Sequence, residues 1–318
     1  MSRVAAAVLA AVALTGTPLH AQDYPHHGLR IIAASAGGSG DFAARLIAQG
    51  FTASMGQPAI VENRGGSVAV SGGLVAKAPP DGYTLFFISN SLWLLPFMQN
   101  NVAYDPVRDF SPITLAVTTP ALLVVHPSLG VKSVKELIAL AKAHPGDLNY
   151  GVTSQGSSTH IASELFKSMT GTNIVAIPYK GTAPAINDLI SGQVQLMFSV
   201  LPPVLPHVKS GRLKGLAVSS AEPSALAPGV PTVAASGLPG FDAVSTQGLL
   251  APAKTPAAII QRLNQETVRI LTRPDVKEKL LNAGADVHAT TPEEFTATIK
   301  SEMTRLGKAI KDAGVHAD

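Results

Sequence analysis

The stretch Ile31-Ile32-Ala33-Ala34-Ser35-Ala36-Gly37-Gly38-Ser39-Gly40-Asp41 decides the fold. An apolar run typical of a β-strand changes into small residues and glycines, and a helical spacing of apolar residues begins at Phe42. A strand that leads through glycines into a helix presents backbone N–H groups at the positive end of the helix dipole, where anions bind. Small side chains also let a ligand approach the main chain closely. The stretch therefore predicts an anion-binding loop.

The chain that follows alternates between expected strands and helices. Apolar runs at 58–63 and 83–88 predict strands, and the small-residue segment 68–77 predicts a helix between them. This alternation is typical of a parallel sheet, whose ligands bind beyond the C-terminal ends of the strands. The long β-branched run 113–125 is interrupted by Thr118-Thr119-Pro120, and it predicts a strand that crosses from one lobe into a second.

The second half of the chain repeats this plan before it returns. The loop Thr153-Ser154-Gln155-Gly156-Ser157-Ser158-Thr159 again precedes a helix. Further strands are expected at 148–152, 174–178, 194–198, 213–219 and 246–251, and further helices at 134–143, 183–191, 201–211, 257–271, 274–283 and 292–313. We therefore predict a two-lobed α/β protein in which residues 22–120 and 221–318 form lobe 1 and residues 121–220 form lobe 2.

The N-terminus has the pattern of a secretory signal peptide. Arg3 precedes a short apolar run at 4–14, a breaker follows at 15–18, and a small-residue cleavage site ends near Ala21. An uncleaved anchor helix is the alternative, but the run is short for a membrane span. We therefore expect a periplasmic protein whose signal peptide covers residues 1–21.

Composition excludes several classes of protein. The 318 residues contain no cysteine, which excludes disulfides, thiol catalysis and a lipid anchor on cysteine. Removal of residues 1–21 takes away Arg3 and no acid, so the formal charge falls from +3 to +2. Because nucleic-acid recognition needs a basic stripe, we expect no nucleic-acid partner.

Two enzyme classes have to be weighed against a binding protein. Gly38-x-Gly40-x-x-Ala43 matches a relaxed dinucleotide fingerprint, and Glu62 ends the next expected strand, where a ribose ligand belongs. A dinucleotide-binding oxidoreductase is therefore the alternative function. Against it, Asp41 within the loop would repel a pyrophosphate, and export removes the protein from its cofactor. Asp41 is instead expected to pair with Arg45 four residues later.

Hydrolysis and metal chemistry have weaker support. Ser157, Ser158 and His160 are close in sequence, but neighbouring positions at a helix start point in different directions and do not form a triad. His160 is expected to pack at the helix N-terminus. The nine histidines show no metal-ligand spacing, so we expect no metal and no cofactor. Trp93 fits the core and the rim of a cleft equally well.

Several ordered blocks of sequence resemble those of one family. The blocks are Gly37-Gly38-Ser39-Gly40-Asp41 with Ala44-Arg45, Val61-Glu62-Asn63-Arg64, Ala76-Lys77-Ala78-Pro79-Pro80-Asp81-Gly82-Tyr83-Thr84-Leu85, Tyr104-Asp105-Pro106-Val107-Arg108-Asp109-Phe110, Gly156-Ser157-Ser158-Thr159-His160, Pro178-Tyr179-Lys180-Gly181, Gly192-Gln193-Val194 and Gly248-Leu249-Leu250-Ala251-Pro252. In these blocks the chain resembles the periplasmic solute-binding proteins of tripartite tricarboxylate transporters, also called the Bug family. The resemblance extends over nearly all of residues 24–318.

The resemblance implies a two-lobed, type II Venus-flytrap fold that holds a small organic carboxylate between its lobes. It also implies a receptor that catalyses no reaction and serves membrane permease subunits or a sensor. We expect a monomer. The family holds a carboxylate largely through backbone groups and waters of the two facing loops. The positions here that match the family's ligand-binding residues are Ala36, Gly37, Gly38, Ser39 and Asp41 in the first loop and Ser157, Ser158 and Thr159 in the second. The rest of the site would be lined by Ser89, Asn90, Ser91, Ala183, Pro184, Ser199, Thr246 and Gln247.

The chain departs from the family pattern at four positions. Ala33-Ala34 replaces the usual Pro-Phe, Ser199 replaces a common Asp, and Thr246 replaces a frequent aromatic residue. These changes predict a roomier and less negative cleft, so the ligand cannot be carried over from any relative. A third interpretation also stays open, a surface interaction protein whose cleft no longer binds a ligand.

Overall fold

We describe the protein from a computed structural model, which defines residues 24–33, 39–64, 67–152, 156–312 and 314–315. The expected signal peptide at 1–21 lies outside these residues. So do positions 34–38 of the first loop and 153–155 of the second. In the part of the chain that the structure describes, no helix has the length and apolar character needed to cross a membrane.

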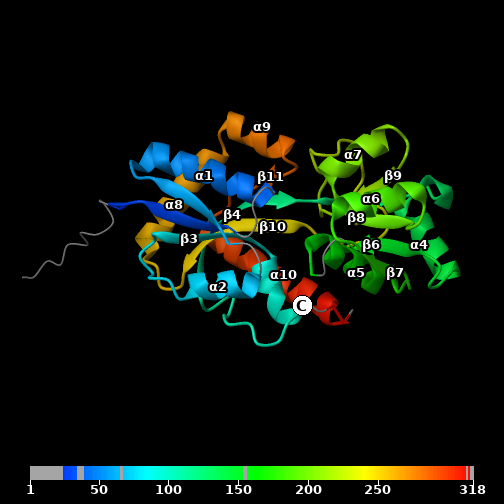
Figure 1. Cartoon of the computed structure of the whole chain (residues 1–318), viewed down its shortest axis with the longest axis horizontal. Helices are drawn as coiled ribbons and strands as arrows, with labels where there is room; N and C mark the ends of the chain where they lie inside the picture. The colour runs from blue at the N-terminus through cyan, green and yellow to red at the C-terminus, as the bar shows by residue number, and fades with distance from the viewer. Residues whose placement is uncertain (1–23, 34–38, 65–66, 153–155, 313, 316–318) are drawn as a thin grey trace, which may run out of the picture.

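Two β-sheets lie side by side along the long axis of the molecule (Figure 1). The first has six strands in the order β11-β4-β10-β3-β1-β2, and the second has five in the order β7-β6-β8-β5-β9. The first consists of β1 (Leu29–Ala33), β2 (Ala59–Asn63), β3 (Thr84–Ser89), β4 (Phe110–Thr119), β10 (Ser245–Pro252) and β11 (Asp286–Val287). The second consists of β5 (Ala121–Val125), β6 (Asn149–Val152), β7 (Val175–Pro178), β8 (Leu196–Val200) and β9 (Lys214–Val218).

Strand direction is mixed in both sheets. β1 runs parallel to β2 and β3, as the alternation predicts, and β6 runs parallel to β7 and β8. β10 is antiparallel to both β3 and β4, and β5 is antiparallel to β8 and β9. In each sheet, expected to be mostly parallel, the strand pairs joined by crossover helices are parallel. The pairs made by strands that carry the chain between the sheets are antiparallel.

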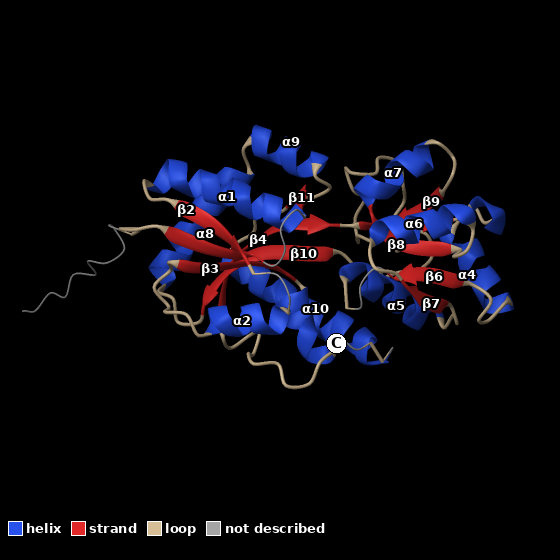
Figure 2. Ribbon diagram, in the orientation of Figure 1, coloured by secondary structure: helices blue, strands red, loops and turns tan. Residues whose placement is uncertain are grey.

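Helices cover both faces of each sheet (Figure 2). They are α1 (Ser39–Met55), α2 (Val68–Ala76), α3 (Ser91–Leu94), α4 (Val134–Ala143), α5 (Ser158–Thr170), α6 (Thr182–Ser191), α7 (Leu201–Lys209), α8 (Ala257–Leu271), α9 (Pro274–Asn282) and α10 (Pro292–Asp312), with 3-10 turns at Leu95–Phe97 and Pro127–Leu129. The start of α10 has a reciprocal cap. Thr291 N donates to Glu294 Oε2 at 2.9 Å, and Glu294 N donates to Thr291 Oγ1 at 3.2 Å.

The chain passes between the sheets at two places. The predicted crossing strand is two strands, because Pro120 separates β4 in the first sheet from β5 in the second. After β9, the chain keeps contacts with the second sheet as far as Ala243, whose N donates to Ser219 O at 2.9 Å. Val233 N donates to Val218 O at 2.9 Å, and the Phe241 ring stacks on Phe198 with centroids 5.8 Å apart. We therefore propose that the second passage lies near residue 244, later than the boundary at 221 expected from sequence.

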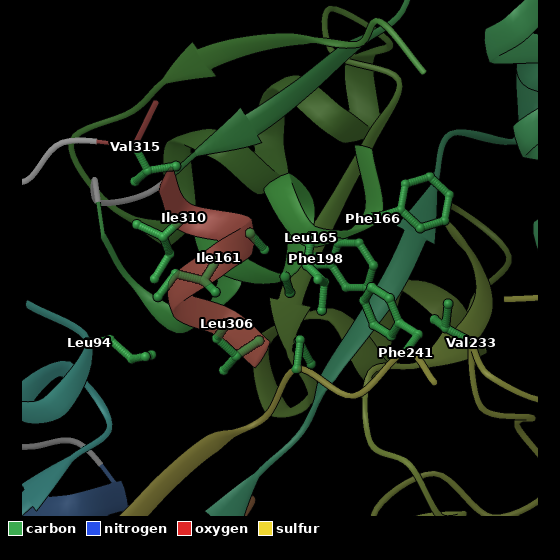
Figure 3. Close-up of a cluster of buried hydrophobic side chains, with 14 of the residues drawn as sticks. Leu94, Ile161, Leu165, Phe166, Phe198, Val233, Phe241, Leu306, Ile310 and Val315 are labelled. Carbon is green, nitrogen blue, oxygen red and sulfur yellow. The ribbon is translucent and has the colours of Figure 1, made fainter. Parts of the chain in front are cut away.

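One buried hydrophobic cluster extends across both sheets (Figure 3). Leu306 and Ile310 of α10 pack there with Ile161 and Leu165 of α5. α10 also packs along β4 of the first sheet. This helix therefore joins the hydrophobic cores of the two lobes.

Candidate functional site

Three polar side chains meet where α1 begins. Ser39 is the first residue of α1, Thr119 ends β4, and Gln247 lies on β10. The Gln247 amide Nε2 donates to Ser39 Oγ and to Thr119 Oγ1, both at 3.3 Å, and the two hydroxyls are 3.3 Å apart. Gly40 allows this approach, because a Cβ there would collide with Gln247 Oε1. The structure thus brings two predicted residues together and adds Thr119, which the sequence analysis missed.

Asp41 is buried beside this cluster and connects α1 to β2. Its Oδ2 accepts from Arg45 Nε at 3.0 Å, and its Oδ1 accepts from Asn63 Nδ2 at 2.8 Å. Arg45 Nη2 also donates to Asn63 Oδ1 at 2.8 Å. The predicted ion pair of Asp41 with Arg45 is confirmed. Because these partners compensate its charge, Asp41 does not by itself make the site negative.

The end of β3 places more polar groups against β10. Ser89 lies opposite Gln247 in the antiparallel pair, and its Oγ is 2.8 Å from Ser91 Oγ. Asn90 N donates to Thr246 O at 2.7 Å, and Asn90 Nδ2 donates to Val244 O at 2.9 Å. Asn90 therefore fixes the start of β10, while Ser89 and Ser91 remain partly exposed next to the Gln247 cluster.

Thr246 faces away from Gln247, as alternation along a strand requires. Its Oγ1 donates to Glu302 Oε1 of α10, and Trp93 Nε1 donates to Glu302 Oε2 at 2.9 Å. Burial raises the pKa of the Glu302 carboxyl, and the two hydrogen bonds act in the opposite direction. Trp93 is fully buried, which assigns it to the core rather than to a cleft rim.

In the second lobe, Ser157 caps α5. Its Oγ accepts from His160 N at 3.3 Å and lies 3.1 Å from Thr159 Oγ1. Gly156 N donates to His160 Nδ1 at 3.1 Å. Ser157, Ser158 and Thr159 are all partly exposed. His160 packs at the helix N-terminus, as expected.

The remaining predicted positions of the second lobe lie at the start of α6 and on β8. Ala183 and Pro184 are exposed in the first turn of α6, and Ala183 lines a cavity of about 340 Å³ between α6 and α7. Ser199 is buried on β8, where its Oγ donates to Val200 O at 3.1 Å. Ala36, Gly37 and Gly38 lie outside the described residues. The ligand site therefore stays a prediction. Its lobe 1 residues are better defined by hydrogen bonds than its lobe 2 residues.

The dinucleotide alternative also has a structural test. The Glu62 carboxylate accepts from Arg30 Nη1 at 3.5 Å and pairs with Arg64 Nη2. Both arginines engage the group that would have to bind a ribose. Within the described ranges, no group of three or more His, Cys, Asp or Glu side chains is placed to hold a metal ion.

Comparison with known proteins identifies the family. The family described as "Tripartite tricarboxylate transporter family receptor" matches residues 43–315. The chain belongs to this receptor family. Protein BugT of Bordetella pertussis is 35% identical over 324 residues, which cover 99% of this chain and 98% of BugT. A UPF0065 protein from the tcbD-tcbE intergenic region of Pseudomonas sp. strain P51 is 35% identical over 284 residues, or 89% of this chain and 84% of that protein.

Solved structures of similar proteins have the same fold. R. palustris Rpa4515 with adipate is 34% identical, with a TM-score of 0.77, and the match covers 93% of this chain and all of that one. MatC from Rhodopseudomonas palustris with bound malate is 28% identical, with a TM-score of 0.73, and the match covers 90% of this chain and all of MatC. The two-lobed, type II fold predicted from sequence is therefore confirmed. The oxidoreductase alternative receives no support.

Proposed function

We propose that this receptor binds a small organic carboxylate between its two lobes and presents it to membrane permease subunits or to a sensor. The observation that carries the proposal is the group of hydroxyl and amide side chains Ser39, Thr119 and Gln247, placed where the first loop enters α1. A carboxylate accepts hydrogen bonds from such groups and is favoured at a helix N-terminus. Adipate and malate, held by the relatives Rpa4515 and MatC, support this class of ligand.

Closure around the ligand would bring the α5 loop toward the α1 loop. We propose that the chain bends at its two passages, near Pro120 and near residue 244, because these are the places where it leaves one sheet for the other. The resemblance of residues 1–21 to a signal peptide and the family both support a periplasmic location. We further propose that the receptor acts as a monomer.

Thermal unfolding of the mature chain, begun at Gln22, tests the proposal. We expect the midpoint to rise with an organic acid from a panel of dicarboxylates, tricarboxylates, aromatic acids and amino acids, because a ligand that binds only the native state stabilises it. At a concentration 100 times Kd the gain is about 2.7 kcal/mol. Calorimetric titration should then give one site per chain. No response to any acid would favour an interaction protein with an unused cleft.

A further inference from the structure

The turn that precedes α5 is closed by two hydrogen bonds to one residue. Gly156 N donates to the His160 ring at Nδ1, 3.1 Å away. The His160 backbone N donates to Ser157 Oγ at 3.3 Å. The side chain and the main chain of His160 thus hold two consecutive residues of the proposed ligand loop.

The first of these bonds fixes the protonation state of the ring. An imidazole nitrogen that accepts a hydrogen bond carries no proton, so the proton of the neutral ring lies on Nε2. A protonated imidazole has an N–H on both nitrogens and no acceptor. The bond from Gly156 therefore exists only while His160 is neutral.

The surroundings of His160 favour the neutral ring. Burial lowers the pKa of His160, and Lys167 lowers it further, whereas Glu164 raises it. The Glu164 carboxylate is itself engaged, since Lys167 Nζ donates to it at 2.7 Å and the Tyr150 hydroxyl of β6 donates to the same oxygen. Next to His160 on α5, Ile161 packs in the apolar cluster that includes Leu306 and Ile310 of α10 (Figure 3).

We propose that His160 is a positioning residue for ligand binding, and that its neutral Nε2–H form holds the Gly156-Ser157 turn in the binding geometry. The inference rests on the proposed function, because it assigns the turn to the ligand site. It goes further because it names the residue that holds the Gly156-Ser157 turn and makes the geometry of that turn depend on one proton. Protonation of the ring would release Gly156 and loosen this turn.

Two substitutions separate this role from simple packing. His160→Phe keeps a ring of similar size and removes the acceptor. His160→Asn places an amide oxygen where Nδ1 lies, so it can accept from Gly156 but does not titrate. We expect His160→Phe to weaken binding of adipate or malate at about pH 8 by roughly 2- to 12-fold, the net value of one hydrogen bond. His160→Asn should bind within about 2-fold of the parent.

The pH profile supplies the second readout. Lowering the pH through the His160 pKa should weaken binding by the parent relative to the His160→Asn variant, because both experience the same titration of the ligand. His126 is the matched control: its Nδ1 also accepts a backbone N–H, from Ser128 at 3.2 Å, but at the start of a 3-10 turn outside the proposed site. His126→Phe should leave ligand affinity and its pH profile unchanged.

Nitrogen NMR of the ligand-free mature chain decides the inference even if no acid of the panel binds. We expect the ring of His160 to carry its proton on Nε2, and the Gly156 amide to exchange faster in the His160→Phe variant. A proton on Nδ1, an unaltered Gly156 exchange rate or equal affinity of the His160→Phe variant would each overturn the role of His160. A chain with the expected tautomer and no affinity for any acid would instead overturn the proposed function.

Discussion

Replacing Glu302 by alanine should destabilise the protein more than any surface change. The carboxylate lies between two fully buried groups, the indole Nε1–H of Trp93 and the hydroxyl of Thr246. Removing it leaves both without their partner at a site that water does not reach. Each unsatisfied buried polar group costs about 1–3 kcal/mol. Alanine no longer has to bury a carboxyl group, which offsets part of this cost. We therefore expect the free energy of unfolding to fall by roughly 2–4 kcal/mol.

Glu302→Gln is the matched control. Its amide oxygen can accept from Trp93 and its NH₂ can donate to the Thr246 hydroxyl, so both bonds survive. We expect a change below about 1 kcal/mol. Urea unfolding of the mature chain, with equal m-values for all variants, measures both numbers. A loss for Glu302→Gln as large as for Glu302→Ala would show that hydrogen-bond satisfaction is not what Glu302 provides.

The raised pKa of Glu302 adds a pH test. A carboxyl whose pKa is higher in the folded chain than its ordinary value of 4.5 stabilises most below that value, and the contribution is lost as the pH rises through the folded pKa. The parent should therefore lose stability relative to the Glu302→Gln variant as the pH rises from about 4 toward neutrality. A difference that stays constant with pH would refute the assignment.

Three further changes test other parts of the structure. Gly40→Ala should displace the Gln247 amide and weaken carboxylate binding in calorimetric titration, while α1 gains up to about 1 kcal/mol in helix propensity. Unchanged affinity would show that the cluster of Ser39, Thr119 and Gln247 is not part of the ligand site. Leu306→Ala should lower the free energy of unfolding in urea by about 2–5 kcal/mol, and Leu281→Ala, at an exposed position, by less than about 0.5 kcal/mol. Equal losses would contradict a hydrophobic core shared by the two lobes. Burial lowers the pKa of His160 below its ordinary value of 6.5, so its neutral ring contributes stability that is lost as the pH drops below that value. The parent should therefore lose free energy of unfolding relative to the His160→Asn variant as the pH falls, and an identical pH dependence of the two would contradict this.

The regular elements could be predicted because each carries its own local pattern. The Thr291–Glu294 cap and the Asp41–Arg45 pair depend on residues three and four apart, and both are present. β11 was missed because two residues are too few to show a period. The antiparallel direction of β10 was also missed, since alternation of side chains is the same in either direction.

The site was harder to predict, because its members are distant in sequence. Gln247 reaches Ser39 across 208 residues, and no local pattern encodes that contact. Thr119 had one usable signal, a polar residue at the end of a strand. Trp93 could not be assigned to core or cleft because its decisive partner, Glu302, lies 209 residues away.

The hydrophobic cluster that α10 shares with α5 determines how the molecule unfolds. Leu306 and Ile310 are almost completely buried, and part of what buries them belongs to the other lobe. Neither lobe therefore has a complete hydrophobic core of its own. Heating should produce a single calorimetric peak rather than two. A fragment that ends before Pro292 would expose the apolar face of α5 to water and should aggregate.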